Sequence, residues 1–287
     1  VVGSDIVQII TDSTCALPPE TTPQVREHIR VLRTSVQFGT ESFVEGALSL
    51  EQFYIRIEQG GPFPHTSQPS PEEYYHTYRE AAPHGPILAI LISAGLSSTY
   101  SSALAMAREV PEADVVAFDS QFFSSALGHM VAEATEMALA GSNREQILER
   151  LAWRRARTAL FIAIDQLSFL QRSGRLNFLQ AGLATMFDLK PVLAVRSGKL
   201  EAIARVRSRR RSLERLLALA KEHALTLDGP VWVSAMHGRA PDTAAWLLAE
   251  MQAQFPVERA FVNEAPASVA LHGGPGVVGV MVTAATS

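Results

Sequence analysis

Short apolar runs of strand length alternate with helical segments along this chain, and no other feature of the sequence restricts its fold as strongly. Most positions within each run are apolar, which is typical of strands that are buried on both faces. The runs occupy residues 6–10, 87–92, 115–118, 160–164, 231–235, 259–262 and 269–271. Up to about residue 160 the alternation is regular, which favours a mainly parallel sheet with flanking helices.

Several helix starts between these runs can be recognised from their capping residues. Ser49, Ser70 and Ser142 each stand three positions before a glutamine or glutamate, which is the spacing of a capping box. A further helix is expected from about residue 122 to Gly141, because glycine suits the left-handed position that ends many helices. Residues 31–44 are expected to form a hairpin that turns at Gly39 and Thr40.

The second part of the chain has a different pattern, with a hairpin signal in place of regular alternation. The elements predicted there are a hairpin over residues 191–206, which turns at Ser197-Gly198, and helices over residues 209–223 and 241–254. We therefore predict an α/β chain of two domains. The first domain, residues 1–160, has the mainly parallel sheet, and the second, residues 161–287, has a mixed sheet.

Composition narrows the class of function. The 287 residues carry a formal net charge of −4, so the broad positive field that nucleic-acid-binding proteins use is absent. Cys15 is the only cysteine, which excludes an internal disulfide and is natural in the reducing cytoplasm. The histidines and carboxylates show no metal-site spacing, and no apolar run is long enough to span a membrane. We expect a cytoplasmic protein that binds a small molecule without a metal or cofactor.

Three short polar clusters carry most of the chemistry in the sequence, at residues 65–69, 93–99 and 272–276. They contain hydroxyl groups, the imidazole of His272 and glycines whose backbone amides a ligand can approach closely. Such groups can bind an anion without a metal or a lysine, above all at the start of a helix. Hydroxyls at these positions can equally serve as helix caps.

Two better-known motifs are matched only in part. Residues 274–279 have the spacing GxGxxG, but only residues 280–287 follow, which leaves no room for the helix and acidic residue of a dinucleotide site. Residues 95–99 resemble the GxSxG turn of serine hydrolases, with Thr99 in place of the last glycine. The branched side chain of Thr99 would crowd that turn. A hydrolase in which a serine and His272 act together is kept as an alternative.

Arginines gather between residues 205 and 215. The simplest interpretation is a solvent-exposed strand edge and helix start, and the alternative is contact with an acidic partner or an anionic membrane surface. The residues expected at a membrane contact are Arg205, Arg207, Arg209 and Arg210. A second basic turn, residues 172–175, is equally ambiguous.

Seven segments of the sequence match the motifs of one family in its order. They are residues 10–14, 66–70, 96–100, 119–120, 172–175, 189–191 and 272–276, and through them the chain resembles the DegV family over essentially its full length. The resemblance implies a long-chain, palmitate-like fatty acid bound in a cleft between two α/β domains. For some members it also implies the role of fatty-acid-binding subunit of bacterial fatty acid kinase, and so a place in phospholipid metabolism. Candidates for closing the tail end are Phe161, Ile164, Phe169, Phe178, Met186 and Phe187.

The carboxylate-binding residues of the family can be carried over position by position. They correspond to Thr66, Ser67, Ser97 and His272, to which the adjacent Ser98 and Gly273 are added. Ser98 stands where the family has a glycine and Ala94 where it usually has a serine, so Ser93, Ser97 and Ser98 all stay candidates for the donor. The resemblance implies a carrier without catalysis of its own, which presents the carboxylate to a separate kinase for phosphorylation to an acyl phosphate. The alternatives are a serine-dependent lipid ester hydrolase and a regulatory protein.

Overall fold

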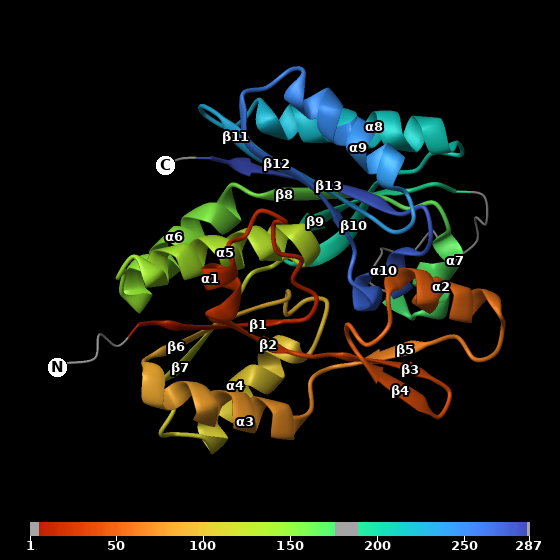
Figure 1. Cartoon of the computed structure of the whole chain (residues 1–287). Helices are drawn as coiled ribbons and strands as arrows, with labels where there is room; N and C mark the ends of the chain where they lie inside the picture. The colour runs from red at the N-terminus through yellow and green to blue at the C-terminus, as the bar shows by residue number, and fades with distance from the viewer. Residues whose placement is uncertain (1–5, 176–188, 286–287) are drawn as a thin grey trace.

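The computed structural model describes residues 6–175 and 189–285, which form alternating layers of helix and sheet (Figure 1). From bottom to top these are α3 (Pro71–Ala81) with α4 (Thr99–Glu109), a parallel sheet, α5 (Ser124–Leu139) with α6 (Arg144–Ala156), a mixed sheet, and α8 (Arg209–Ala224) with α9 (Pro241–Gln252). The middle helix α5 contacts strands of both sheets. The predicted fold class, α/β with a mainly parallel sheet followed by a mixed one, is confirmed.

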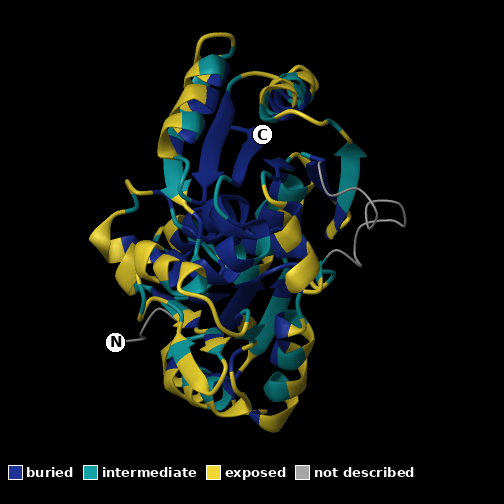
Figure 2. Ribbon diagram, turned by 90° about the vertical axis from the view of Figure 1, so that its right-hand side faces the viewer, coloured by how far each residue is buried: buried dark blue, intermediate teal, exposed yellow. Residues whose placement is uncertain are grey.

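The parallel sheet has the strand order β2-β1-β6-β7. Its strands are β1 (Gln8–Asp12), β2 (Ile29–Leu32), β6 (Ile87–Leu91) and β7 (Val115–Asp119), with α1 (Pro23–Glu27) between the first two and η1 (Ala82–His84) after α3. Every residue of the central strands β1 and β6 is buried, because helices cover both faces of the sheet. Figure 2 shows the buried residues concentrated in the sheets and in the layer between them.

Two of the three predicted helix starts are confirmed. Ser49 caps α2 (Leu50–Glu58) and Ser70 caps α3, each by accepting a hydrogen bond from a backbone amide of the first turn. The third helix starts one residue later than predicted, because Asn143 rather than Ser142 caps α6 and forms the capping box.

A small antiparallel sheet extends beyond the parallel one, on the side of the molecule where α2 lies (Figure 1). Its strands are β3 (Ser35–Phe38), β4 (Glu41–Val44) and β5 (His65–Ser67), in the order β4-β3-β5. The predicted hairpin is confirmed in its turn at Gly39, whose φ is 60°. Its predicted first strand was too long, because residues 29–32 form β2 in the parallel sheet.

The mixed sheet has the strand order β10-β9-β8-β13-β11-β12. Its strands are β8 (Ala159–Ala163), β9 (Val192–Arg196), β10 (Lys199–Ala204), β11 (Val231–His237), β12 (Val257–Glu264) and β13 (Val278–Ala284). The predicted hairpin of β9 and β10 is confirmed, and Ser197 and Gly198 in its turn both have positive φ, as a type I′ turn requires. The division of the chain near residue 160 stays a prediction.

The strand predicted at residues 269–271 is wrong. These residues belong to helix α10 (Ala267–Gly273), which lies beside α7 (Leu167–Arg172), and the last strand of the sheet is β13. An apolar run this short has no clear period, so the sequence alone does not separate helix from strand. A tertiary contact supports the helix, because the Glu45 carboxylate accepts hydrogen bonds from the amides of Ala267 and Ser268 at its start.

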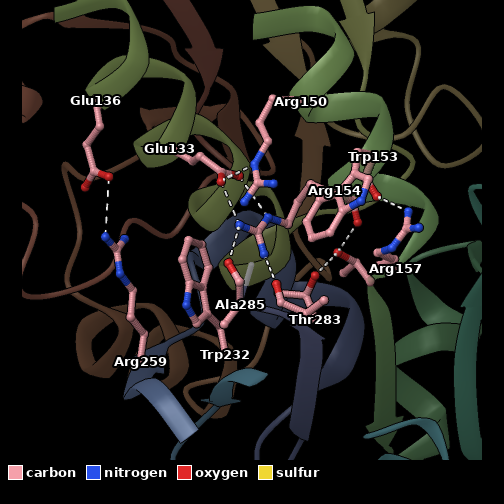
Figure 3. A network of polar contacts seen from close by, with 12 residues as sticks. Glu133, Glu136, Arg150, Trp153, Arg154, Arg157, Trp232, Arg259, Thr283 and Ala285 are labelled. Atoms are coloured by element: carbon pink, nitrogen blue, oxygen red, sulfur yellow. Dashed lines mark hydrogen bonds and ion pairs between the residues drawn. The ribbon is translucent and has the colours of Figure 1, made fainter. Parts of the chain in front are cut away.

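A buried ion pair joins the middle helices to the mixed sheet (Figure 3). The guanidinium of Arg154 on α6 donates to both carboxylate oxygens of Glu133 on α5, at 2.8 and 2.6 Å. It also donates to the carbonyl oxygen of Ala284 and lies 3.9 Å from the ring centre of Trp232 on β11.

Within residues 6–175 and 189–285 no helix is long and apolar enough to cross a membrane.

Candidate ligand-binding site

A cavity of about 550 Å³ lies between the parallel-sheet part and the mixed-sheet part of the chain. Its volume is within the range of roughly 300–1,000 Å³ that is usual for small-molecule sites. Much of the wall is apolar, with Ile92, Leu96 and Phe123 on one side and Ile162, Leu193 and Met236 on the other. A cavity of this size and polarity can hold a largely apolar ligand.

The six residues that the sequence singled out all line this cavity: Thr66, Ser67, Ser97, Ser98, His272 and Gly273. They come from three distant parts of the chain, namely β5, the turn before α4 and the end of α10. Gln68 and Ala94 line the cavity as well. These two residues and Ser98 are exposed, so the polar part of the wall reaches the surface. Ile162, Leu193 and Met236 are buried. The cavity therefore has a polar mouth and an apolar interior.

The three candidate serines differ in their contacts. Ser93 is buried, does not line the cavity, and donates to the carbonyl oxygen of Gly198 at 2.6 Å. The Ser98 hydroxyl donates to the side-chain oxygen of Gln68 at 2.5 Å. The Ser97 hydroxyl accepts from the Thr99 amide at 3.2 Å and lies 2.9 Å from the Thr99 hydroxyl, which can donate to it, and Ser97 lines the cavity. Ser97 is thus the candidate whose hydroxyl is best placed for a ligand.

Two aspartates at strand ends hold the turn that carries these serines. The buried carboxylate of Asp12 accepts from the Ile92 amide at 2.7 Å, and burial raises the pKa of this carboxyl. Asp119 accepts from the Ala94 amide at 3.1 Å and from the Gln121 amide at 2.9 Å. These carboxylates are occupied by backbone amides, so they position the site rather than line it.

His272 is neutral at physiological pH. Burial, together with the smaller effect of the positive charge of Arg175, lowers the pKa of its imidazole to about 3. Its Nδ1 atom is buried and has no hydrogen-bond partner among the described residues. A neutral imidazole keeps one N–H donor, and the structure holds this side chain at the cavity wall.

Arg175 is the functional candidate that the sequence prediction missed. It lies in the basic turn that follows α7 and is the only charged side chain among the described residues that line the cavity. Its guanidinium donates to the carbonyl oxygen of Ser173 at 2.8 Å, and burial lowers its pKa. The turn over residues 172–175 was the available signal, but only the fold shows that its last residue faces the cavity beside His272.

The glycine cluster after His272 does not present free amides as the sequence suggested. The amides of Gly274 and Gly276 donate to the carbonyl oxygens of Ala270 and Gly238. Gly274 has a φ of 73°, and a Cβ added there would lie 2.7 Å from the ring of Phe169. These glycines allow close packing behind the cavity wall.

The basic cluster is only partly free. Arg205, Arg207 and Arg210 are exposed, and Arg210 lies 3.5 Å from Glu214 on the same helix. Arg209 is half-buried and donates to the carbonyl oxygens of Ala163 and Gly276, so its guanidinium has a structural role. No group of three or more metal-binding side chains occurs among the described residues.

The geometry gives no support to a serine hydrolase. The partner of the Ser97 hydroxyl is Thr99, at 3.2 Å to the amide and 2.9 Å to the hydroxyl. No hydrogen bond joins a serine to His272 in the part of the chain that the structure describes. The pairing of nucleophile and base on which such an enzyme depends is therefore not seen.

Comparison with known proteins gives consistent relatives over the whole chain. A DegV domain-containing protein of Streptomyces coelicolor is 31% identical, with 96% of this chain and 98% of that protein covered. A DegV family protein from Thermus thermophilus, solved in a study of its fatty acid binding, is 32% identical at a TM-score of 0.87, covering 97% of this chain and 99% of the other. DegV from Bacillus subtilis, a fatty-acid-binding protein, is 28% identical at a TM-score of 0.87, covering 96% and 98%.

The family model agrees with these relatives. The sequence model of the family that is described as "Uncharacterised protein, DegV family" matches residues 6–285. This span includes all three sheets and all six of the predicted site residues. The chain therefore belongs to the DegV family.

Proposed function

We propose that this protein binds one long-chain fatty acid, with the carboxylate at the polar mouth of the cavity and the acyl chain in its interior. The observation that carries the proposal is the division of one cavity into a polar part that reaches the surface and a buried apolar part. The relatives from T. thermophilus and B. subtilis, which bind fatty acid, support it. The cleft would lie between a domain of residues 1–160 and one of residues 161–287.

Neutral donors and one cation would hold the carboxylate. Thr66, Ser97 and His272 offer two hydroxyls and an imidazole N–H along the cavity wall. Ser67, Ser98 and the backbone at Gly273 complete the polar lining, although Gln68 already accepts the proton of Ser98. A buried carboxylate needs such partners, because an unpaired charge is costly away from water.

Arg175 would supply the positive charge that a carboxylate requires. Since the pKa of His272 is lowered to about 3, the imidazole stays neutral and the guanidinium is the cation of the site. Hydrogen bonds between ionised partners are shorter and stronger than those between neutral ones. The site would therefore prefer an ionised acid to its ester.

The acyl chain would provide most of the affinity. If about 14 methylenes of a palmitate-sized chain are buried at about 0.8 kcal/mol each, the gross transfer free energy is about 11 kcal/mol. Association and ordering costs of about 4–15 kcal/mol reduce this value. The polar mouth then orients the acid, and the apolar interior binds it.

The position of the mouth supports a role in transfer to an enzyme. We infer that the carboxylate is presented to a separate kinase, which phosphorylates it to an acyl phosphate for phospholipid metabolism in the bacterial cytoplasm. The proposal is supported by Gln68 and Ser98, which line the cavity and are exposed at the surface. The exposed Arg205, Arg207 and Arg210 would favour a transient contact with an anionic membrane during loading.

Lipid analysis of the purified protein tests the binding proposal. Organic extraction followed by mass spectrometry should release about one equivalent of fatty acid, either co-purified or bound after incubation with palmitate. Finding no fatty acid in either preparation would refute the proposal. Labelling of Ser97 or Ser98 by a serine-directed probe would instead favour the hydrolase.

A trapping assay tests the kinase proposal separately. The loaded protein with ATP alone should give no acyl phosphate, detected as a hydroxamate after addition of hydroxylamine. Addition of a bacterial extract that contains a fatty-acid-phosphorylating kinase should produce the hydroxamate in proportion to the added protein. Formation by the protein alone, or no stimulation of the extract, would contradict the carrier role.

A further inference from the structure

The inner face of the mixed sheet forms one wall of the cavity, and its residues lie in rows across the strands. The register places Leu193, Ile162, Gly279 and Met236 side by side on β9, β8, β13 and β11. Three of the four line the cavity, and the fourth is the glycine. Residues paired in this way point to the same face of a sheet. The row therefore crosses the cavity wall with a gap at Gly279.

The neighbouring rows show on which side of this row the polar end lies. On one side, just outside β8 and β13, Ile164 and Val277 line the cavity. Val277 lies against the segment of His272, because a Cβ at Gly273 would lie 2.8 Å from its side chain. The row on the other side pairs Leu160 with Met281, which are buried but do not line the cavity. The row of Met236 is thus the last one that the cavity reaches.

Met236 fills the gap that Gly279 leaves in this row. A Cβ added at Gly279 would lie 2.8 Å from Cε of Met236, 3.1 Å from its Cγ and 3.2 Å from the carbonyl oxygen of Phe161. The methionine side chain therefore lies directly over the glycine backbone, in space that any other residue at position 279 would occupy. Methionine is unbranched and flexible, so it fills irregular gaps that a stiffer side chain leaves open.

We propose that Met236, seated on Gly279, sets the length of acyl chain that the cavity accepts. This inference rests on the proposed fatty acid binding and specifies its substrate. Removing the end of the methionine would extend the cavity beyond its last row. A methyl group on residue 279 would push Met236 into the cavity and shorten it. The two positions therefore have opposite effects on the same boundary.

Affinities for saturated fatty acids from laurate to arachidate test this assignment in Met236→Ala and Gly279→Ala. Met236→Ala should move the best ligand to a longer chain and Gly279→Ala to a shorter one. Each methylene gained or lost should change Kd by about fourfold. Met236→Val, a smaller truncation, should shift the preference in the direction of Met236→Ala by less, and it decides the case if the alanine variant does not fold.

Met251→Ala is the matched control. Met251 is equally buried, but it belongs to α9 and to the core on the outer face of the mixed sheet, away from the cavity. This variant should lower stability without changing the chain-length preference. An unchanged preference in the folded Met236 and Gly279 variants, or the same shift in Met251→Ala, would overturn the assignment. If the parent protein binds no fatty acid at all, the proposed function itself fails.

Discussion

His272 and His129 are similar in protonation and different in surroundings. Burial and nearby arginines lower the pKa of each imidazole to about 3. Each has a buried ring nitrogen without a partner among the described residues. His272 lines the cavity, whereas His129 on α5 stacks on Trp232 at 5.4 Å and lies 4.7 Å from Phe261. A lowered pKa therefore reports burial in both regions, and only one has room for a ligand.

The arginines beside the two histidines differ in the same way. Arg154, close to His129, has Glu133 as a buried partner in the network of Figure 3. Arg175, close to His272, makes no ion pair with a carboxylate within residues 6–175 and 189–285. A cation that already has its anion supports the fold, and a cation at a cavity wall without one is suited to a carboxylate ligand. Arg154 and His129 thus belong to a structural centre, and Arg175 and His272 to the candidate binding site.

Removing the buried charge near His129 should give the largest effect. Arg154→Met removes the fully buried partner of Glu133 and leaves it only the more exposed Arg150, so the free energy of unfolding should fall by up to about 3–5 kcal/mol. The matched control is Arg259→Met, because Arg259 forms a more exposed pair with Glu136 that should be worth about 0–1 kcal/mol. Urea denaturation measures both. Equal losses in the two variants would contradict a structural role specific to Arg154.

Removing the positive charge of Arg175, near His272, should weaken the binding of palmitate. Arg175→Met should weaken palmitate binding by about 10- to 100-fold, since a hydrogen bond to a charged group contributes about 1.5–3 kcal/mol. Stability should change little. Arg172→Met is the control, because Arg172 lies over the ring of Phe63 and does not line the cavity. Calorimetric titration with palmitate distinguishes them, and equal affinities in both variants would remove Arg175 from the site.

The pH dependence of stability should separate the two histidines from each other. The folded pKa of about 3 is below the ordinary value of 6.5, so between these pH values the unfolded state binds more protons. Stability should therefore fall as the pH drops through this window, by up to about 1.4 kcal/mol per pH unit for each histidine. His129→Phe should remove one share of this slope and leave palmitate affinity unchanged. Denaturation curves at several pH values measure how steeply the stability of His129→Phe falls with pH. This slope should be smaller than that of the parent protein, and an equal slope would contradict the prediction.

The smallest expected difference in palmitate affinity is between alanine variants of the two adjacent serines. Ser97→Ala should weaken palmitate binding by about fivefold, because one hydrogen bond contributes about 1 kcal/mol. Ser98→Ala should change it less than twofold, since Gln68 already accepts the hydroxyl proton of Ser98. Parallel titrations measure the pair. A larger loss of palmitate affinity in Ser98→Ala than in Ser97→Ala would identify Ser98, and not Ser97, as the donor.

The parts of the fold that depend on local signals could be predicted from the sequence. Buried strands such as β1 and β6, the caps Ser49 and Ser70, and the turn at Gly198 follow from neighbouring residues alone. Helix α10 could not, because the contact that supports its first turn comes from Glu45, more than two hundred positions earlier. Without knowledge of such a long-range contact, the sequence of a short apolar segment is compatible with both strand and helix.

The same distinction applies to the candidate site. The polar clusters that contain Ser97 and His272 were visible as motifs, and residues of both line one cavity. Arg175 was visible only as part of a basic turn, since its place beside His272 depends on how α7 and α10 pack. Phe161 packs in the core on the outer face of the mixed sheet, and of the tail-end candidates only Ile164 lines the cavity among the described residues. Phe178, Met186 and Phe187 lie outside those residues.

We propose that the cavity binds a fatty acid through an ionised head group at a polar mouth. Titration of the lipid-free protein with palmitate and with methyl palmitate tests it most directly, because the two ligands share one acyl chain and differ in charge. We predict that palmitate binds at one equivalent and at least tenfold more tightly than the ester, in keeping with the contribution of charge-assisted hydrogen bonds. Equal affinity for the two ligands would exclude recognition of the ionised head group, and no binding of palmitate would exclude a fatty acid site.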